Sequence, residues 1–161
     1  MIRSRPVLAV FPGLMIAGAG LFAALPASSH TTGAPPLVEE RQAAMEDMKD
    51  AMKVLGPMVK GEAPFDAAQA AEAAAVIHGV STRIPDFYPT DSTYYEPGHA
   101  LPAVWEESDA FRDEAAEALE AAAALREAVD GAGAAAAIAP AVKEVAETCR
   151  ACHDDFKKDE D

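Results

Sequence analysis

Apolar residues recur every three or four positions along four stretches of this chain, which is the spacing of amphipathic helices. No stretch shows the strict alternation of apolar and polar residues that a half-buried strand requires. One charged residue, Arg41, falls within the first apolar stripe. The pattern therefore predicts four helices and no sheet. In chain order, the predicted buried faces are Val38, Met45, Met48, Met52 and Leu55; Ala70, Ala73, Ile77, Val80 and Ile84; Val104, Phe111, Ala115, Ala118, Ala122, Leu125 and Val129; and Ile138, Val142, Val145, Cys149, Cys152 and Phe156.

Prolines and glycines indicate where these helices end. The breaker density between residues 85 and 101 predicts a long connection without helix, which we expect to run from one end of the bundle to the other. The sequence predicts an all-α, antiparallel four-helix bundle with one long crossover between its second and third helices. The expected breaks are Gly56-Pro57 interrupting the first helix, with one more turn at Met58 and Val59 before Gly61, Pro85 after the second, Pro102 opening the third, and Pro140 in the first turn of the last or at a kink.

The first 27 residues have the composition of a secretory signal peptide. Arg3 and Arg5 precede an apolar stretch, and Ala27 is followed by small residues suited to cleavage. An uncleaved membrane anchor is the alternative, because the apolar run approaches spanning length. We expect cleavage near residue 27, export to the periplasm, and a single domain over residues 28–161.

The chain is strongly acidic, with 27 Asp and Glu against 13 Lys and Arg. Such a charge does not favour nucleic acid, whose binding depends on basic side chains that displace counterions. It suits association with a protein partner that presents a basic surface, and it equally suits a surface that is merely well solvated.

Near the C-terminus the chain contains its only two cysteines in the pattern Cys149-Arg150-Ala151-Cys152-His153. This is the attachment motif of c-type haem. Two thiols one helical turn apart can add to the two vinyl groups of one haem, and the adjoining imidazole can bind the iron. Both cysteines fall on the buried stripe, so an attached porphyrin is expected to lie inside the bundle, near the C-terminal helix. A disulfide or a redox dithiol is the competing interpretation.

The other axial position of the iron has several candidates. Methionine sulfur and histidine nitrogen both bind haem iron, whereas a row of methionines at helical spacing is also an ordinary core. The spacing alone leaves open Met45, Met48, Met52, Met58, His78, His99, or no ligand at all.

Beyond this motif, the chain from about Val38 to Lys158 resembles class II cytochromes c of the cytochrome c-prime family. The position of the haem motif near the C-terminus is similar to that family. The other shared segments are Arg41-Gln42, Lys60 to Asp66, Phe87-Tyr88-Pro89, Ala103-Val104-Trp105 with Phe111, and Cys149 to Lys157.

The resemblance implies roles for residues of the first helix. The residue four positions after the arginine, here Met45, faces the distal side of the haem, and methionine there is typical of the low-spin, six-coordinate branch. Arg41 and Gln42 correspond to a pair near the haem propionates, whereas a salt bridge from Arg41 to Glu117 or Glu120 is the alternative. Lys157 stands where many relatives have arginine. Relatives often dimerise through their first two helices.

Three functions follow as hypotheses. We first expect an exported one-electron carrier with one haem c and His153/Met45 ligation. The alternative is a five-coordinate protein that binds or scavenges nitric oxide or carbon monoxide. A bundle without haem, closed by a disulfide, is the third. No acid–base pair or nucleophile triad is visible, so we expect no enzyme and assign no catalytic residue.

Overall fold

The structure is a computed structural model that describes residues 36–89 and 99–158. Within these residues the chain is helical, and its only strand-like pairing is a single antiparallel bridge between Ala100 and Lys157. No helix in this part of the chain is both long enough and apolar enough to cross a membrane. The elements are α1 (Pro36–Lys60), α2 (Ala67–Ser81), the 3-10 helix η1 (Ile84–Phe87), α3 (Ala103–Glu106), α4 (Ser108–Val129) and α5 (Ala135–Phe156).

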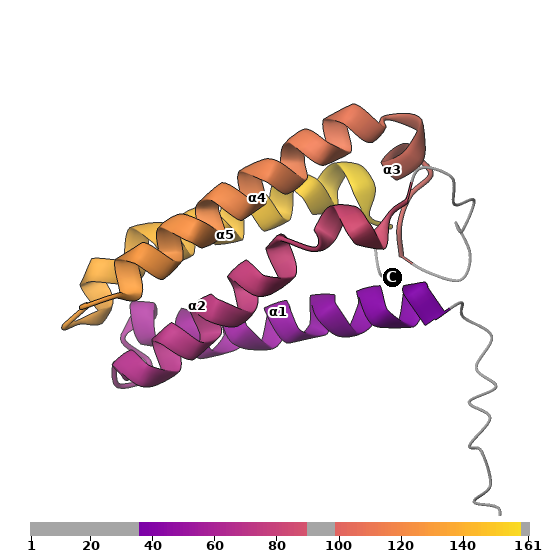
Figure 1. Cartoon of the computed structure of the whole chain (residues 1–161). Coiled ribbons are helices and arrows are strands. Elements are labelled where there is room, and N and C mark those ends of the chain that lie inside the picture. The colour runs from indigo at the N-terminus through magenta and orange to yellow at the C-terminus, as the bar shows by residue number, and fades with distance from the viewer. Residues whose placement is uncertain (1–35, 90–98, 159–161) are drawn as a thin grey trace, which may run out of the picture. The chain divides into compact units, whose positions relative to one another are not determined.

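The four long helices, α1, α2, α4 and α5, form the predicted antiparallel bundle (Figure 1). Each packs against two others, in the cyclic order α1, α2, α4, α5. The predicted apolar stripes meet in the middle, and Leu55, Ile77, Leu125 and Ile138 are completely or almost completely buried there. The fold class is therefore confirmed.

The first helix lacks the predicted interruption at Gly56-Pro57, but α1 has the further turn that was expected before Gly61 and continues to Lys60. Pro57 removes only one backbone hydrogen bond, and the helix needs just one more turn. Gly61 then ends it in a left-handed conformation (φ 73°). The Gly61 N–H donates to Met58 (3.2 Å) and the Glu62 N–H to Pro57 (2.9 Å), which is the Schellman pattern.

The second helix begins where expected and ends early. The Asp66 side chain accepts hydrogen bonds from the N–H groups of Ala68 (2.9 Å) and Gln69 (3.0 Å), so it caps α2. The helix ends at Ser81, four residues before Pro85, and the chain tightens into η1. Ile84 is buried from this 3-10 turn, so the predicted apolar position is right although its helix is not.

The predicted third helix is two helices. Glu107, at φ −116° and ψ 44°, departs from helical geometry and separates the single turn α3 from the long α4. This break turns α3 across the end of the bundle (Figure 1). Trp105 of α3 donates its indole N–H to the Pro89 carbonyl at 3.2 Å, which ties the turn to the chain after η1.

The expectation that the long connection runs the length of the bundle is wrong. The end of α2 and the start of α4 lie at the same end of the bundle (Figure 1). Tyr88, just after η1, contacts Arg41 of α1 and Phe111 of α4, so the start of α1 is there too. The described parts of the connection, up to Pro89 and from His99, therefore lie at this one end of the bundle. We call it the capped end, because η1 and α3 lie there.

The last helix carries Pro140 as its sixth residue and stays unbroken. Its C-terminus reaches the capped end, where Phe156 packs edge-on against Phe111 with ring centroids 5.3 Å apart. Backbone bonds from Leu101 to Phe156 (2.9 Å) and from Lys158 to His99 (2.7 Å) attach the end of the connection to the end of α5. The haem motif is thereby placed under the cap.

Candidate haem site

A cavity of about 500 Å³ lies at the capped end of the bundle, between α1, α4 and α5. Its size is within the range of cavities that hold organic ligands. It is lined by residues from the first turns of α1, from the connection, from the first half of α4 and from the last turns of α5. Sequence reasoning placed the haem inside the bundle, and the structure provides an apolar cavity at that place.

Cys149, Cys152 and His153 all line this cavity from α5. Both thiols are half-buried and neither forms a disulfide, whereas His153 is exposed. The motif thus presents two sulfurs and one imidazole to a single space, which is the donor set that a c-type haem requires. Their roles as attachment points and iron ligand remain predictions.

Burial raises the pKa of the Cys149 thiol. Burial, with the nearby carboxylate of Glu114, raises the pKa of Cys152 to about 12. Both cysteines are therefore protonated at neutral pH in the folded chain. A reactive dithiol needs a lowered pKa, so these values disfavour the redox-dithiol interpretation.

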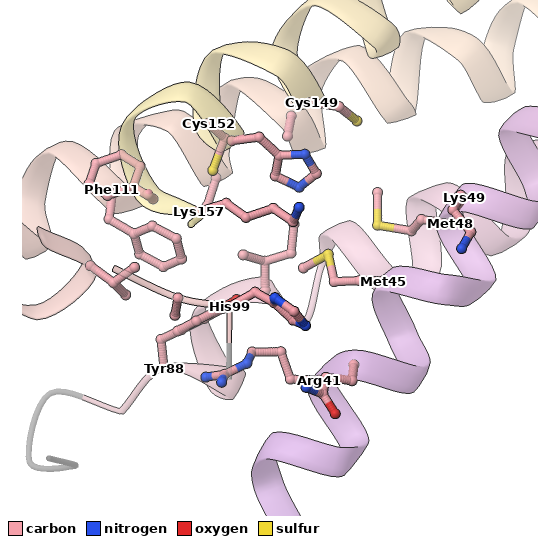
Figure 2. A pocket seen from close by; sticks show the side chains of 18 of the residues that line it. Arg41, Met45, Met48, Lys49, Tyr88, His99, Phe111, Cys149, Cys152 and Lys157 are labelled. Atoms are coloured by element: carbon pink, nitrogen blue, oxygen red, sulfur yellow. The ribbon is translucent and has the colours of Figure 1, made fainter. Parts of the chain in front are cut away.

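On α1, Met45 and Met48 reach the cavity (Figure 2). Met45 is half-buried and packs against both apolar clusters of the bundle, whereas Met48 is buried in one of them. His99, from the end of the connection, also lines the cavity. These three residues are the candidates for the second axial position that the structure brings to the site.

The remaining candidates lie elsewhere. Met52 and Met58 belong to the core and do not line the cavity. His78 approaches Arg126, with Nδ1 3.3 Å from Nη1, across the contact between α2 and α4.

Arg41 is the most unusual side chain of the site, because its guanidinium is buried with only 5% of the residue exposed. It lies over the Tyr88 ring, 4.7 Å from the centroid. Its Nη2 atom has no hydrogen-bond partner, so the expected alternative of a salt bridge to Glu117 or Glu120 does not satisfy it. A buried cation without an anion is costly. Arg41 is one of the residues that line the cavity, so an anionic group of a ligand held there is a candidate partner for its guanidinium. Gln42, its neighbour, is exposed at the rim.

Tyr88 was noticed in the sequence, but its contact with Arg41 was not predicted. Burial raises the pKa of its phenol to about 12 even though Arg41 opposes the shift. The ring stays neutral and packs edge-on against Phe111, with centroids 4.8 Å apart. It holds Arg41 against the cavity wall. The only sequence signal was its position in Phe87-Tyr88-Pro89.

The residues of this cavity fit a c-type haem. Two thiols and an imidazole line one apolar space, and an unpartnered buried guanidinium stands where a propionate can pair with it. The helical bundle and this site together place the protein in the class of small helical proteins that bind haem covalently.

Comparison with known proteins assigns the family. Residues 36–157 match the family model described as Cytochrome C'. Cytochrome c' of Rhodopseudomonas palustris is 31% identical over 150 residues, which cover 93% of this chain and 94% of that protein. The chain belongs to the cytochrome c' family, whose members carry one covalently bound c-type haem.

Solved structures agree with this assignment. Cytochrome c' from Rubrivivax gelatinosus superposes with a TM-score of 0.70 at 31% identity, covering 76% of this chain and 94% of that one. A variant of cytochrome c prime from Alcaligenes xylosoxidans, solved as its nitric oxide complex, has a TM-score of 0.68 at 28% identity with the same coverage.

Proposed function

We propose that this protein binds a small gas molecule, nitric oxide or carbon monoxide, at the iron of one haem held in the cavity. The observation that carries this function is the nitric oxide complex of the Alcaligenes xylosoxidans protein, which shares the fold. The cavity supports it, since its α1 wall includes the thioether side chains of Met45 and Met48. The polarity of the pocket on the open side of a haem iron decides which small molecules bind there, and these two side chains are apolar.

Each residue of the site has a proposed task. Cys149 and Cys152 hold the haem by thioether bonds, and His153 binds the iron. Arg41, steadied by Tyr88, pairs with a propionate at the inner wall, and Gln42 stands beside it at the rim. The bound haem supplies an iron atom that takes an axial gas ligand and can change its oxidation state.

A one-electron carrier with His153/Met45 ligation is the second candidate. Met45 favours it, because its side chain lines the same cavity as His153. Two permanent ligands would keep the iron six-coordinate in both oxidation states. The sequence by itself favours electron transfer, whereas the comparisons with known proteins favour gas binding.

Replacement of Met45 by leucine separates the two functions. If the iron is five-coordinate, the reduced protein is high-spin and binds carbon monoxide, and Met45→Leu changes only the affinity. If Met45 is a ligand, the reduced protein is low-spin and resists carbon monoxide until Met45→Leu opens the site. Optical spectra of the reduced holoprotein, with and without carbon monoxide, measure this.

Met52→Leu is the matched control, because Met52 lies two turns further along α1 and does not line the cavity. Its spectra should equal those of the unchanged protein. A low-spin reduced protein that excludes carbon monoxide would refute gas binding as the main function. A low-spin spectrum that survives Met45→Leu would remove Met45 as the ligand.

We also propose a homodimer through α1 and α2. A shallow groove of about 510 Å³ runs between these helices, with an apolar floor and with Asp47, Asp50 and Glu72 at its edge. Because carboxylates of two copies would repel each other, the dimer should be tighter at 0.5 M salt than at low salt. Sedimentation equilibrium measures this, and a monomer at both salt concentrations contradicts it.

Export to the periplasm remains a proposal, because the predicted signal peptide (1–27) lies outside the described residues. Sequencing the N-terminus of the mature protein tests it. We assign no catalytic residue, because the proposed roles are haem attachment, iron ligation and gas binding.

A further inference from the structure

The charge of the cavity mouth differs from that of the rest of the protein. The whole chain has 27 acidic against 13 basic side chains. Around the cavity the ratio is reversed: Arg41, Lys49 and Lys157 line it together with His99, and Glu46 is the only acidic residue among the lining residues. Net charge therefore does not describe the surface nearest the haem site.

Three of these lining residues have side chains that can carry positive charge, and we call them the basic rim: Lys49, His99 and Lys157. Lys49 comes from α1, and the other two come from the opposite wall (Figure 2). That wall is held together by the Ala100–Lys157 bridge and by the Lys158 N–H, which donates to the His99 carbonyl at 2.7 Å. Backbone pairing thus joins the connection to α5 and brings His99 and Lys157 to one side of the mouth.

Lys49 and His99 are exposed, and Lys157 is half-buried. The Lys49 side chain is 54% exposed and pairs with Glu46, one turn earlier on the same helix. Exposed pairs of this kind are weak. Haem propionates would add two negative charges, and Arg41, buried beneath the rim, is placed to offset one of them. The charges that line the cavity then nearly cancel, whereas the whole chain has a formal net charge of −14.

We propose that the basic rim is the surface on which an acidic electron-transfer protein docks to exchange one electron with the haem iron. The net charge of the chain repels an acidic partner, and the basic rim weakens this repulsion locally, so the field of the protein favours approach at the cavity. A basic partner, which net charge alone predicts, would be drawn to the acidic faces. This inference rests on the proposed haem site, and it holds whether or not the iron binds a gas.

Lys49 and Lys53 provide a matched test. They lie one turn apart on α1, each paired with a carboxylate three residues earlier, with side chains 54% and 62% exposed. Only Lys49 lines the cavity. Lys49→Gln and Lys53→Gln change net charge equally, so a difference between them reports local charge at the haem edge. Lys49 is also preferable to Lys157, because three acidic residues that follow Lys158 lie outside the described residues.

The experiment measures oxidation of the ferrous holoprotein by stopped flow at an ionic strength of about 0.1 M, where the Debye length is about 10 Å. The haem iron gives one electron to hexacyanoferrate(III), an anion, or to tris(phenanthroline)cobalt(III), a cation. The haem iron becomes ferric, and the metal of the oxidant goes from the +3 to the +2 state. Removing one positive charge about 8 Å from a trivalent anion in water, with screening by salt, should change the rate of electron transfer to that anion about threefold. Lys49→Gln should slow hexacyanoferrate about threefold and speed the cobalt complex, whereas Lys53→Gln should change neither by more than about 1.5-fold.

A protein probe extends the test to the proposed partner. Reduction of the ferric holoprotein by an acidic flavodoxin should slow more in Lys49→Gln than in Lys53→Gln. Equal effects of the two variants, with any of the three reagents, would show that only net charge matters and would overturn the proposal. Carbon monoxide binding, measured on the same samples, tests the gas-binding function separately, since neither lysine contributes an iron ligand.

Discussion

Changing Cys149 and Cys152 together to serine is expected to abolish covalent attachment, so that acidified organic solvent extracts the haem completely from the double variant. Both thiols line one cavity, and no other cysteine exists in the chain to replace them. Each single variant should keep the haem through one thioether bond. Extraction followed by the pyridine haemochrome spectrum measures this, because the wavelength of its absorption maximum depends on how many vinyl groups are not attached to a cysteine.

His153→Gly serves as the control for this prediction. It should keep the covalent haem, because both cysteines remain, but it should lose the proximal ligand and change the spin state. Haem that stays bound to the double serine variant after extraction would contradict the assignment of the two cysteines. A His153→Gly protein with an unchanged spectrum would contradict the assignment of the iron ligand.

Arg41→Met is expected to lower the free energy of unfolding of the holoprotein by about 3–5 kcal/mol, the usual cost of removing one partner from a buried ion pair. Arg41 is 5% exposed, and the structure offers its Nη2 atom no protein partner, so a propionate is the proposed anion. The unpaired propionate should also lower the reduction potential, because negative charge near the iron favours the ferric state. Guanidinium unfolding and redox titration measure the two effects.

Arg83→Met is the matched control for Arg41→Met. Arg83 also stacks on a ring, with its guanidinium 4.8 Å from the Phe87 centroid, but it is 52% exposed and pairs with Glu40 outside the cavity. Its loss should cost less than about 1 kcal/mol and leave the potential unchanged. Equal effects of the two substitutions would remove Arg41 as a propionate ligand.

Much of the site could be predicted from the sequence because it depends on local spacing. Cys149, Cys152 and His153 lie within about one turn of one another on α5, so the helix alone brings them together. The apolar stripes are equally local, and they correctly placed Leu55, Ile77 and Leu125 in the core.

Breaks within helices were harder to predict. An interruption was expected at Gly56-Pro57, but α1 continues through this pair. No break was expected at Glu107, but it divides the predicted third helix into α3 and α4. Helix propensity is weak compared with packing, and the cap formed by Trp105 and Pro89 decides where α3 turns.

By itself, the sequence determined the helical class, the buried faces and the haem attachment motif, since these follow from residue spacing along one chain. Only the tertiary structure decided that the two described ends of the long connection lie at one end of the bundle, where Tyr88, His99 and Ala100 line the cavity. That arrangement left Arg41 buried beneath Tyr88 without a protein anion, and it gathered Lys49, His99 and Lys157 around the mouth. These residues are far apart in sequence, and no periodicity in any one segment encodes how segments meet.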